Sequence, residues 1–159
     1  MQFRKGCRLW YLAVLALALD RISKIWAARV LRASGAREVI PGVLSFAYAE
    51  NRGMAFSMLS GKTLLLSLAT VAIIAVVLIW LLHDAEMPKL QRVGLWLIAG
   101  GGAGNLYDRI FGGYVVDFIR PDFINFAVFN LADVFICAGA GLVLLAAIIL
   151  ESRKGKPHG

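Results

Sequence analysis

Two aspartates in the second half of the sequence are the side chains best suited to carry out chemistry. Asp117 ends a strand-like stretch, and Asp133 lies at the start of an apolar run that continues to about Leu150. If the two carboxyl groups approach each other, repulsion between like charges keeps one of them protonated. The ionised carboxylate can then take a proton from a water molecule while the neutral one donates to a scissile carbonyl group. The pair therefore suggests aspartyl-type peptide hydrolysis.

Other hydrolytic and nucleotide-binding chemistries fit the sequence less well. It contains no His-Glu-x-x-His motif, and Cys7 and Cys137 have no metal-ligand spacing, so we expect no metal and no cofactor. We also expect no disulfide, because the two cysteines are predicted to lie at different depths. Ser23 and Lys24 are adjacent and diverge by about 100° on a helix, which disfavours a Ser-Lys hydrolase.

The composition indicates an integral membrane protein. Of the 159 residues, 60% are hydrophobic, against about 45–50% in soluble domains, and they occur in long runs. The net charge of +7 comes from Lys and Arg in terminal and connecting segments. There they orient the protein and meet anionic lipid, so we expect the phospholipid bilayer as a partner and no nucleic acid.

The hydrophobic runs predict one membrane domain over residues 1–159. Its fold class is mainly α, a bundle of four transmembrane helices at about 9–30, 63–82, 93–110 and 132–150, with outer loops 31–62 and 111–131. Basic residues at both ends and in the central connection place the termini in the cytoplasm. The N-terminus resembles a secretory signal, but helical character continues to Gly35, so we expect an uncleaved anchor.

Polar residues interrupt the first and third predicted helices. Asp20 and Lys24 share one helix face and are expected to form an ion pair, either as a neutralised polar face or as a support beneath an active site. The glycine-rich run 100–104 is expected to let neighbouring helices approach closely. We interpret Asp108 as part of a polar cluster that ends the third helix, and Trp96 as marking the side at which that helix begins.

The outer loops carry strand and turn signals. Residues 38–40 and 43–48 predict short strands around a turn at Pro41 and Gly42, and residues 114–119 predict another. The stretch 51–56, which includes Gly53, suits either a loop that grips an extended peptide or an ordinary turn. Asn130 is a good helix N-cap with Asp133 three residues later, so a purely structural reading of both residues stays open.

Several motifs together resemble the lipoprotein signal peptidase family, also called signal peptidase II. The resemblance covers essentially the whole chain and rests on five stretches: Asp20-Arg21-Ile22-Ser23-Lys24, Asn51-Arg52-Gly53-Met54-Ala55-Phe56, Gly104-Asn105-Leu106-Tyr107-Asp108-Arg109, Val116-Asp117-Phe118 and Phe129-Asn130-Leu131-Ala132-Asp133. It implies that Asp117 and Asp133 are catalytic. It also implies supporting roles for Asp20, Lys24, Asn51, Asn105, Arg109 and Asn130.

The resemblance further implies a substrate and a location. The substrate would be a bacterial prolipoprotein whose lipobox Cys carries a diacylglyceryl group, with cleavage just before that Cys at the outer face of the inner membrane. A small extracytoplasmic β-cradle and inhibition by globomycin-type peptides are implied as well. Arg21 stands where the family commonly has Gln, and we expect it to point away from the Asp20–Lys24 face.

Two other classes of function compete with the peptidase. A small proton-coupled membrane transporter would use Asp20, Lys24 and Asp133 as pathway residues. The sequence shows no internal repeat of the kind many carriers have, and its acids gather near one surface. In a structural membrane subunit, capping and ion pairing would explain every acidic residue.

Overall fold

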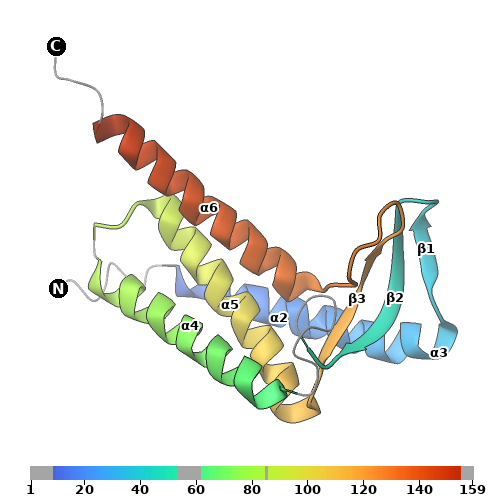
Figure 1. Cartoon of the computed structure of the whole chain (residues 1–159). Helices are drawn as coiled ribbons and strands as arrows, with labels where there is room; N and C mark the ends of the chain where they lie inside the picture. The colour runs from blue at the N-terminus through green and yellow to red at the C-terminus, as the bar shows by residue number, and fades with distance from the viewer. Residues whose placement is uncertain (1–8, 54–61, 85, 155–159) are drawn as a thin grey trace.

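A computed structural model describes residues 9–53, 62–84 and 86–154 as a bundle of helices with a small sheet at one end (Figure 1). The first helical segment runs through α2 (Trp10–Trp26), the π-helix η1 (Ala27–Leu31) and α3 (Arg32–Ser34). The other long helices are α4 (Thr63–His83), α5 (Lys89–Gly112) and α6 (Leu131–Lys154). Each predicted hydrophobic run is therefore helical, and the first, third and fourth helices extend several residues beyond their predicted ends.

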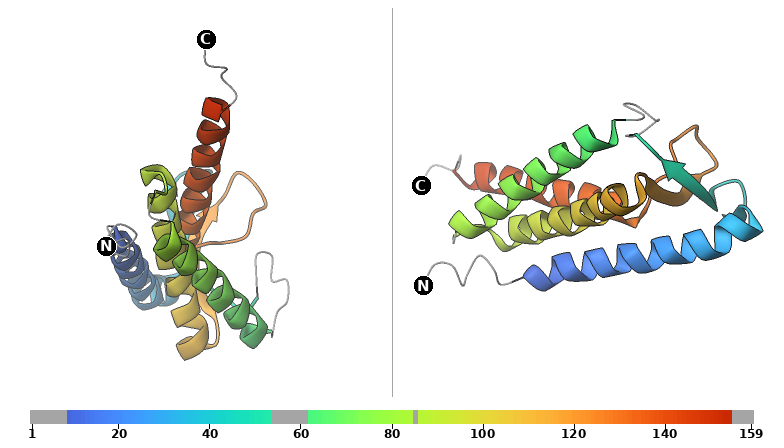
Figure 2. Two further views of the ribbon diagram at one scale, coloured as in Figure 1. Left: turned by 90° about the vertical axis from the view of Figure 1, so that its left-hand side faces the viewer. Right: turned by 90° about the horizontal axis from the view of Figure 1, so that it is seen from below.

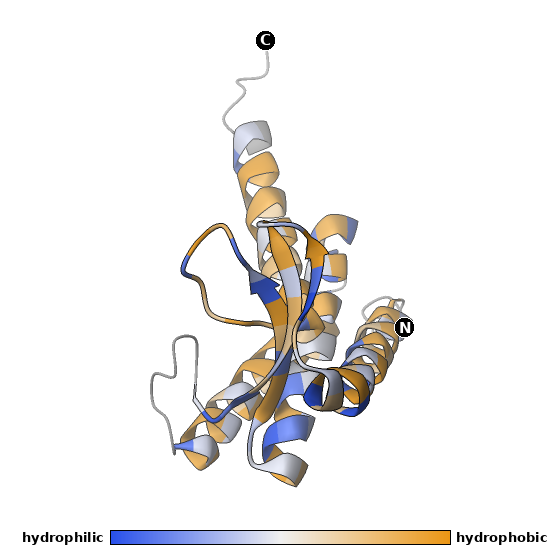
Figure 3. Ribbon diagram, turned by 90° about the vertical axis from the view of Figure 1, so that its right-hand side faces the viewer, coloured by the Kyte–Doolittle hydropathy of each residue, from blue (hydrophilic) through white to orange (hydrophobic). Residues whose placement is uncertain are grey.

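The outer surfaces of the helices are apolar, as expected for contact with lipid. Within the described residues, Thr63–His83 and Leu131–Ser152 are long and apolar enough to cross a bilayer. Large side chains on α4 and α6 point outward, and Leu64 is 74% exposed. Hydrophobic colouring dominates the helices, whereas the sheet is mixed (Figure 3). Exposed apolar surface on this scale is typical of a membrane protein rather than a soluble one.

Helix α5 is the centre of the bundle, because it packs against α2, α4 and α6. Its glycine run makes this possible. A Cβ atom at Gly100 would lie 2.6 Å from the Ala13 carbonyl oxygen on α2, and one at Gly101 would lie 2.5 Å from the Ala132 carbonyl oxygen on α6. The prediction that this run is a packing surface is therefore confirmed.

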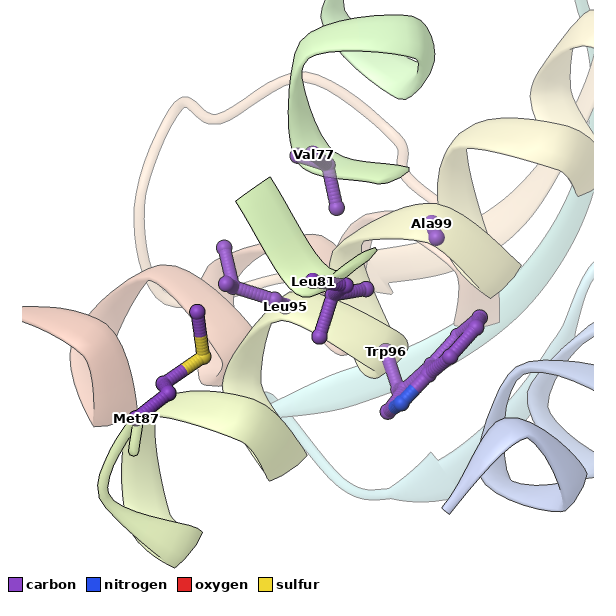
Figure 4. Close-up of a cluster of buried hydrophobic side chains, with 6 residues drawn as sticks. All are labelled: Val77, Leu81, Met87, Leu95, Trp96 and Ala99. Carbon is purple, nitrogen blue, oxygen red and sulfur yellow. The ribbon is translucent and has the colours of Figure 1, made fainter. Parts of the chain in front are cut away.

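A cluster of buried apolar side chains fixes α4 against the beginning of α5. It consists of Val77, Leu81, Met87, Leu95, Trp96 and Ala99 (Figure 4). Trp96 lies near the start of α5, and it is only 8% exposed because it packs inside the bundle.

The sheet has three antiparallel strands in the order β1-β2-β3: β1 (Arg37–Ile40), β2 (Leu44–Asn51) and β3 (Val115–Pro121). The predicted strands and the turn at Pro41 and Gly42 are confirmed, and Gly42 takes the positive φ of 68° that this turn requires. Gly35, with φ 77°, ends the first helical segment as expected. The sheet lies at the end of the molecule opposite the start of α2 and the end of α6 (Figures 1 and 2).

Aromatic and aliphatic contacts hold the sheet against the first helix. Phe118 on β3 is buried with Ala27 and Leu31 of η1. Phe46 on β2 makes edge contacts with Phe118 and with Trp26, at centroid distances of 6.0 and 5.4 Å. Since Phe118 follows Asp117 in the chain, these contacts also fix the backbone beside that aspartate.

The close approach at Gly101 leads to a test of the packing. We expect Gly101→Val to destabilise the protein by about 1–3 kcal/mol, because its side chain would overlap α6 at Ala132. Gly141→Ala is the matched control, since its Cβ meets nothing within 4 Å. Thermal unfolding of the purified proteins in detergent measures both. Equal melting temperatures for Gly101→Val and the wild type would contradict this account of the interface.

Candidate functional site

Asp117 and Asp133 line the same cavity, which has a volume of about 600 Å³. Asp117 comes from the middle of β3 and Asp133 from the first turn of α6. Three other polar residues named in the sequence analysis line this cavity as well: Asn51, Asn105 and Arg109. The fold thus brings together residues from β2, β3, α5 and α6 at the junction between the sheet and the helices.

Asp117 is held by two amide groups. Its carboxylate accepts hydrogen bonds from Asn51 Nδ2 at 2.9 Å and from Asn130 Nδ2 at 2.6 Å. The residue is only 2% exposed. The two contacts fix both carboxylate oxygens, one against β2 and the other against the residue that precedes α6.

Asp133 both caps the start of α6 and lines the cavity. Its Oδ2 accepts from the backbone N–H of Asn130 at 3.1 Å, and its own N–H donates to Asn130 Oδ1 at 3.1 Å. This reciprocal pair is a capping box at the start of α6. Its Oδ1 accepts from Asn105 Nδ2 at 2.8 Å. The N-cap predicted for Asn130 is confirmed, and both residues also belong to the network around the cavity.

A buried cation orients the side-chain amides. Lys24 Nζ donates to Asn105 Oδ1 at 2.8 Å, and Asn130 Nδ2 donates to the same oxygen at 3.2 Å. Since the Asn105 oxygen accepts both bonds, its amino group faces Asp133. A continuous chain of polarised hydrogen bonds therefore runs from Lys24 through Asn105 and Asn130 to the two aspartates.

The predicted ion pair of Asp20 and Lys24 lies at the start of this series of hydrogen bonds. Lys24 Nζ contacts Asp20 Oδ2 at 2.9 Å, and the two side chains are 1% and 0% exposed. Asp20 Oδ1 accepts from the backbone N–H of Ala132 at 3.0 Å, which ties α2 to the first turn of α6. Gly104 lies so close to the Asp20 carboxylate that a Cβ at this position would overlap it. Asp20 and Lys24 do not line the cavity, but Lys24 contacts Asn105, which does.

The environment of Asp117 shifts its pKa. Burial is the main reason that the pKa of the carboxyl group is raised to about 6, and the negative charge of Asp133 acts in the same direction. Hydrogen bonds from Asn51 and Asn130 and the charge of Lys24 act in the opposite direction. Burial prevails, so Asp117 holds its proton at a pH where an exposed aspartate is fully ionised.

Gly53 acts on the site through Asn51. Its backbone N–H donates to Asn51 Oδ1 at 2.9 Å, so the amino group of Asn51 is left to face Asp117. Gly53 is buried but does not line the cavity. The continuation of this motif, residues 54–56, lies outside the described residues.

One expectation for the first helix is wrong. Arg21 does not point away from the ion pair, because its guanidinium binds the carboxylate of Asp108, which Lys24 also contacts at 3.0 Å. Asp108 belongs to a polar cluster near the end of α5, as expected, and it is the buried partner of two cations. The prediction followed helix spacing within α2 alone, and a neighbouring helix supplies the partner.

The apolar wall of the cavity was not predicted from the sequence. It is formed by Val115, Phe126, Ala127, Val128, Phe129, Val134, Cys137 and Ala138. Cys137 is a free, exposed thiol one helical turn beyond Asp133, a spacing that could have placed it beside the site. The segment 126–129 follows no regular pattern, so no comparable signal pointed to it. Cys7 lies outside the described residues.

Solved structures define the class to which this fold belongs. A bacterial membrane enzyme solved by the in meso method at 2.3 Å superposes with a TM-score of 0.86 and 29% identity, covering 94% of this chain and 92% of that one. A second, solved at 1.9 Å, gives a TM-score of 0.78 with 30% identity, covering 86% and 90%. The chain therefore has the fold of a bacterial membrane enzyme.

The sequence comparisons identify the family. The signal peptidase (SPase) II family model matches residues 12–149. Proteins named lipoprotein signal peptidase from Clostridium novyi and Streptococcus agalactiae are 40% and 37% identical over 146 and 144 residues. These alignments cover 90% and 91% of this chain and 96% and 93% of the relatives. The chain belongs to the signal peptidase II family. This membership favours the peptidase over the transporter and the structural subunit.

The raised pKa of Asp117 predicts how pH affects stability. A carboxyl group whose pKa is higher in the folded state favours folding below pH 4 and loses that contribution as pH rises through about 6. Raising the pKa of Asp117 from its ordinary value of 3.8 to about 6 corresponds to about 3 kcal/mol. We therefore expect Asp117→Asn to gain stability relative to the wild type between pH 4 and pH 7.5. Thermal unfolding in detergent at both pH values measures this difference, and an equal offset at both would contradict the assignment.

Proposed function

We propose that the protein is an aspartic endopeptidase that removes the signal peptide from diacylglyceryl-modified bacterial prolipoproteins, cleaving before the lipidated Cys. One observation carries this proposal: Asp117 and Asp133 line the same cavity. Hydrogen bonds through Asn130 and Asn105 connect their two carboxyl groups. Membership in the signal peptidase II family supports the same reaction. Relatives named lipoprotein signal peptidase support the substrate class.

The positions of the two aspartates in the fold give them different roles. Asp133 accepts two N–H groups and lies at the N-terminus of α6, an end of the helix at which the dipole favours a carboxylate. Asp117 has a raised pKa because it is buried. We therefore assign the role of the proton donor to Asp117, which keeps its proton up to about pH 6, and the role of the base to Asp133.

This division gives each aspartate a role in hydrolysis. Asp133 takes a proton from a water molecule, whose oxygen forms a bond to the scissile carbonyl carbon, while Asp117 donates its proton to the carbonyl oxygen. The tetrahedral intermediate then collapses. Asp133 passes its proton to the leaving nitrogen as the C–N bond breaks, and Asp117 recovers a proton from the hydroxyl group. The protonation states at the end equal those at the start.

The shape of the site suits an extended peptide with an apolar portion. The large cavity adjoins a smaller hollow of about 230 Å³ along β2, and the two share Asn51, Asp117 and the segment 126–128. The reacting bond would lie at this junction. Arg109 contributes a cation to the larger cavity, where it can bind peptide carbonyl oxygens. Globomycin-type cyclic peptides would inhibit by occupying the same cavity.

The proposal includes an arrangement in the membrane. Helices α2, α4, α5 and α6 would each cross the bacterial inner membrane, and together they would form one domain. Both termini would lie in the cytoplasm. The buried charges of α2 and α5 pair with each other inside the bundle, which makes these two helices tolerable at membrane depth. The sheet and the cavity would then lie at the outer face, where the substrate's lipidated Cys is presented.

The two aspartates are tested by isosteric substitution. We expect Asp117→Asn and Asp133→Asn each to lower the rate of cleavage of a diacylglyceryl-modified precursor by roughly 10³-fold or more, because each removes a proton donor or acceptor. The measurement is a gel or mass-spectrometric assay with purified enzyme in detergent. Asp122→Asn is the matched control, since Asp122 binds Ser45 and Arg120 away from the cavity. Substantial turnover by either dyad variant would exclude the proposed mechanism.

The raised pKa of Asp117 also predicts the pH dependence of activity. The active form of the free enzyme carries one proton on the pair, and that proton leaves Asp117 near pH 6. We therefore expect kcat/KM to fall tenfold per pH unit well above pH 6. A profile of initial rates between pH 4.5 and 8.5 at low substrate concentration measures this limb. A kcat/KM that rises through pH 6 would instead place the required form of Asp117 as the carboxylate.

A further inference from the structure

Asp108 is a buried carboxylate that the proposed mechanism does not use. It lies near the end of α5 and is 6% exposed, and three donors bind it. Its Oδ2 accepts from Lys24 Nζ at 3.0 Å and from the backbone N–H of Val116 at 3.2 Å. Its Oδ1 accepts from the guanidinium of Arg21. It is thus joined both to α2 and to β3 one residue before Asp117.

The contact with Val116 matters because β3 is an edge strand. β3 pairs with β2 on one side, and Asp117 is the register partner of Ala49. On the other side, the amides that flank Asp117 are bonded outside the sheet, that of Val116 to Asp108 and that of Phe118 to the Phe129 carbonyl at 2.9 Å. Asp117 therefore lies between two anchored backbone amides, and Asp108 anchors the first of them, that of Val116.

The same carboxylate completes the coordination of Lys24. An ammonium group has three donors, and those of Lys24 meet Asp20 at 2.9 Å, Asn105 at 2.8 Å and Asp108 at 3.0 Å. With Asp108 in place, Lys24 keeps one donor for Asn105 and so keeps the amide chain oriented. Asp108 thus acts on Asp117 through the backbone and on Asp133 through Lys24 and Asn105.

Arg21 holds Asp108 in this position. Its guanidinium binds the carboxylate and lies over the ring of Tyr107, with Cζ 4.3 Å from the ring centroid. It also balances the charge of the cluster, which then contains two acids, Asp20 and Asp108, and two cations, Lys24 and Arg21. An Arg at this position binds the oxygen of Asp108 that Lys24 and Val116 leave free.

We propose that Asp108, held by Arg21, is a positioning residue that sets the backbone at Val116 and the orientation of Lys24, and through them the two aspartates of the cavity. The kinetic part of this proposal rests on the proposed peptidase function. The structural part does not, because the mobility of the backbone around Asp117 can be measured without substrate.

The test compares Asp108→Asn with Asp84→Asn, the same substitution in the α4–α5 connection at the opposite end of the bundle. In Asp108→Asn the new side-chain amide would bring one acceptor and one donor group to a place where three donors converge, so at least one contact becomes repulsive. We expect amide hydrogen exchange in a peptide covering residues 114–118 to accelerate at least tenfold in Asp108→Asn and to stay unchanged in Asp84→Asn. Exchange is read by mass spectrometry on protein in lipid nanodiscs.

Kinetics separate positioning from a loss of folded protein or of binding. We expect Asp108→Asn to lower kcat roughly 10- to 100-fold with KM changed less than threefold, while Asp84→Asn keeps both. Unchanged exchange at 114–118, or a rise in KM that accounts for the whole loss, would overturn the proposal. Accelerated exchange together with an inactive wild-type enzyme would reject the proposed function and keep the structural role.

Arg21→Gln provides a milder variant should Asp108→Asn fail to fold, because it leaves the Val116 and Lys24 contacts in place. We expect it to accelerate exchange at 114–118 by a smaller factor, about two- to fivefold. In a folded Asp108→Asn background it should add no further loss of kcat, since Arg21 acts through Asp108. Exchange equal to the wild type in Arg21→Gln, or additive losses in the double variant, would remove Arg21 from the proposal.

Discussion

The site depends on one buried ammonium group. Lys24 is 1% exposed, and a charge at such a position is tolerated only when it is paired and fully hydrogen-bonded. Its three acceptors come from two helices, Asp20 on its own helix and Asn105 and Asp108 on α5. The close approach of α2 to α5 that this requires is provided by glycines of α5, one of which faces Ala13 and another Asp20. Helix packing and site electrostatics are therefore parts of one constraint.

The ammonium group also gives the network its direction. A side-chain amide can be turned either way, and its orientation is decided by the groups it meets. Lys24 can only donate, so it fixes the oxygen of Asn105, and that oxygen in turn accepts from Asn130. The amino groups of both asparagines are thereby directed at carboxylates. Both acids of the proposed dyad meet donors, and neither faces an amide oxygen.

The sequence was sufficient for contacts that follow from local spacing. The ion pair of Asp20 with Lys24, the cap at Asn130 and the turn at Gly42 each involve residues within four positions of one another, where backbone geometry dictates the neighbour. The run of glycines in α5 predicted close packing for a similar reason, since small residues in an apolar helix have few other uses. The positions of the helices and strands followed from hydrophobic runs and turn residues.

Contacts between distant segments could not be predicted in this way. Asp108 meets Arg21 across 87 positions, and neither residue's own helix periodicity reveals the other. The same holds for the apolar wall at 126–129, which takes its place because Phe129 pairs with Ile119 at the edge of β3. The burial of Trp96 could not be predicted either, because an aromatic residue near a helix start is equally suited to a membrane boundary and to a core. Only the fold decides between them.

Asn130 and Asp133 show why a structural reading and a functional one need not compete. A capping box ordinarily satisfies exposed amides at a helix end. Here Asn130 is completely buried, and its side chain bonds Asp117 and Asn105 while it also caps α6. The cap fixes Asp133 relative to the axis of α6, and the helix dipole stabilises its negative charge. A helix start thus supplies both the rigidity and the electrostatic asymmetry that a carboxylate pair needs if one member is to remain ionised beside a neutral partner.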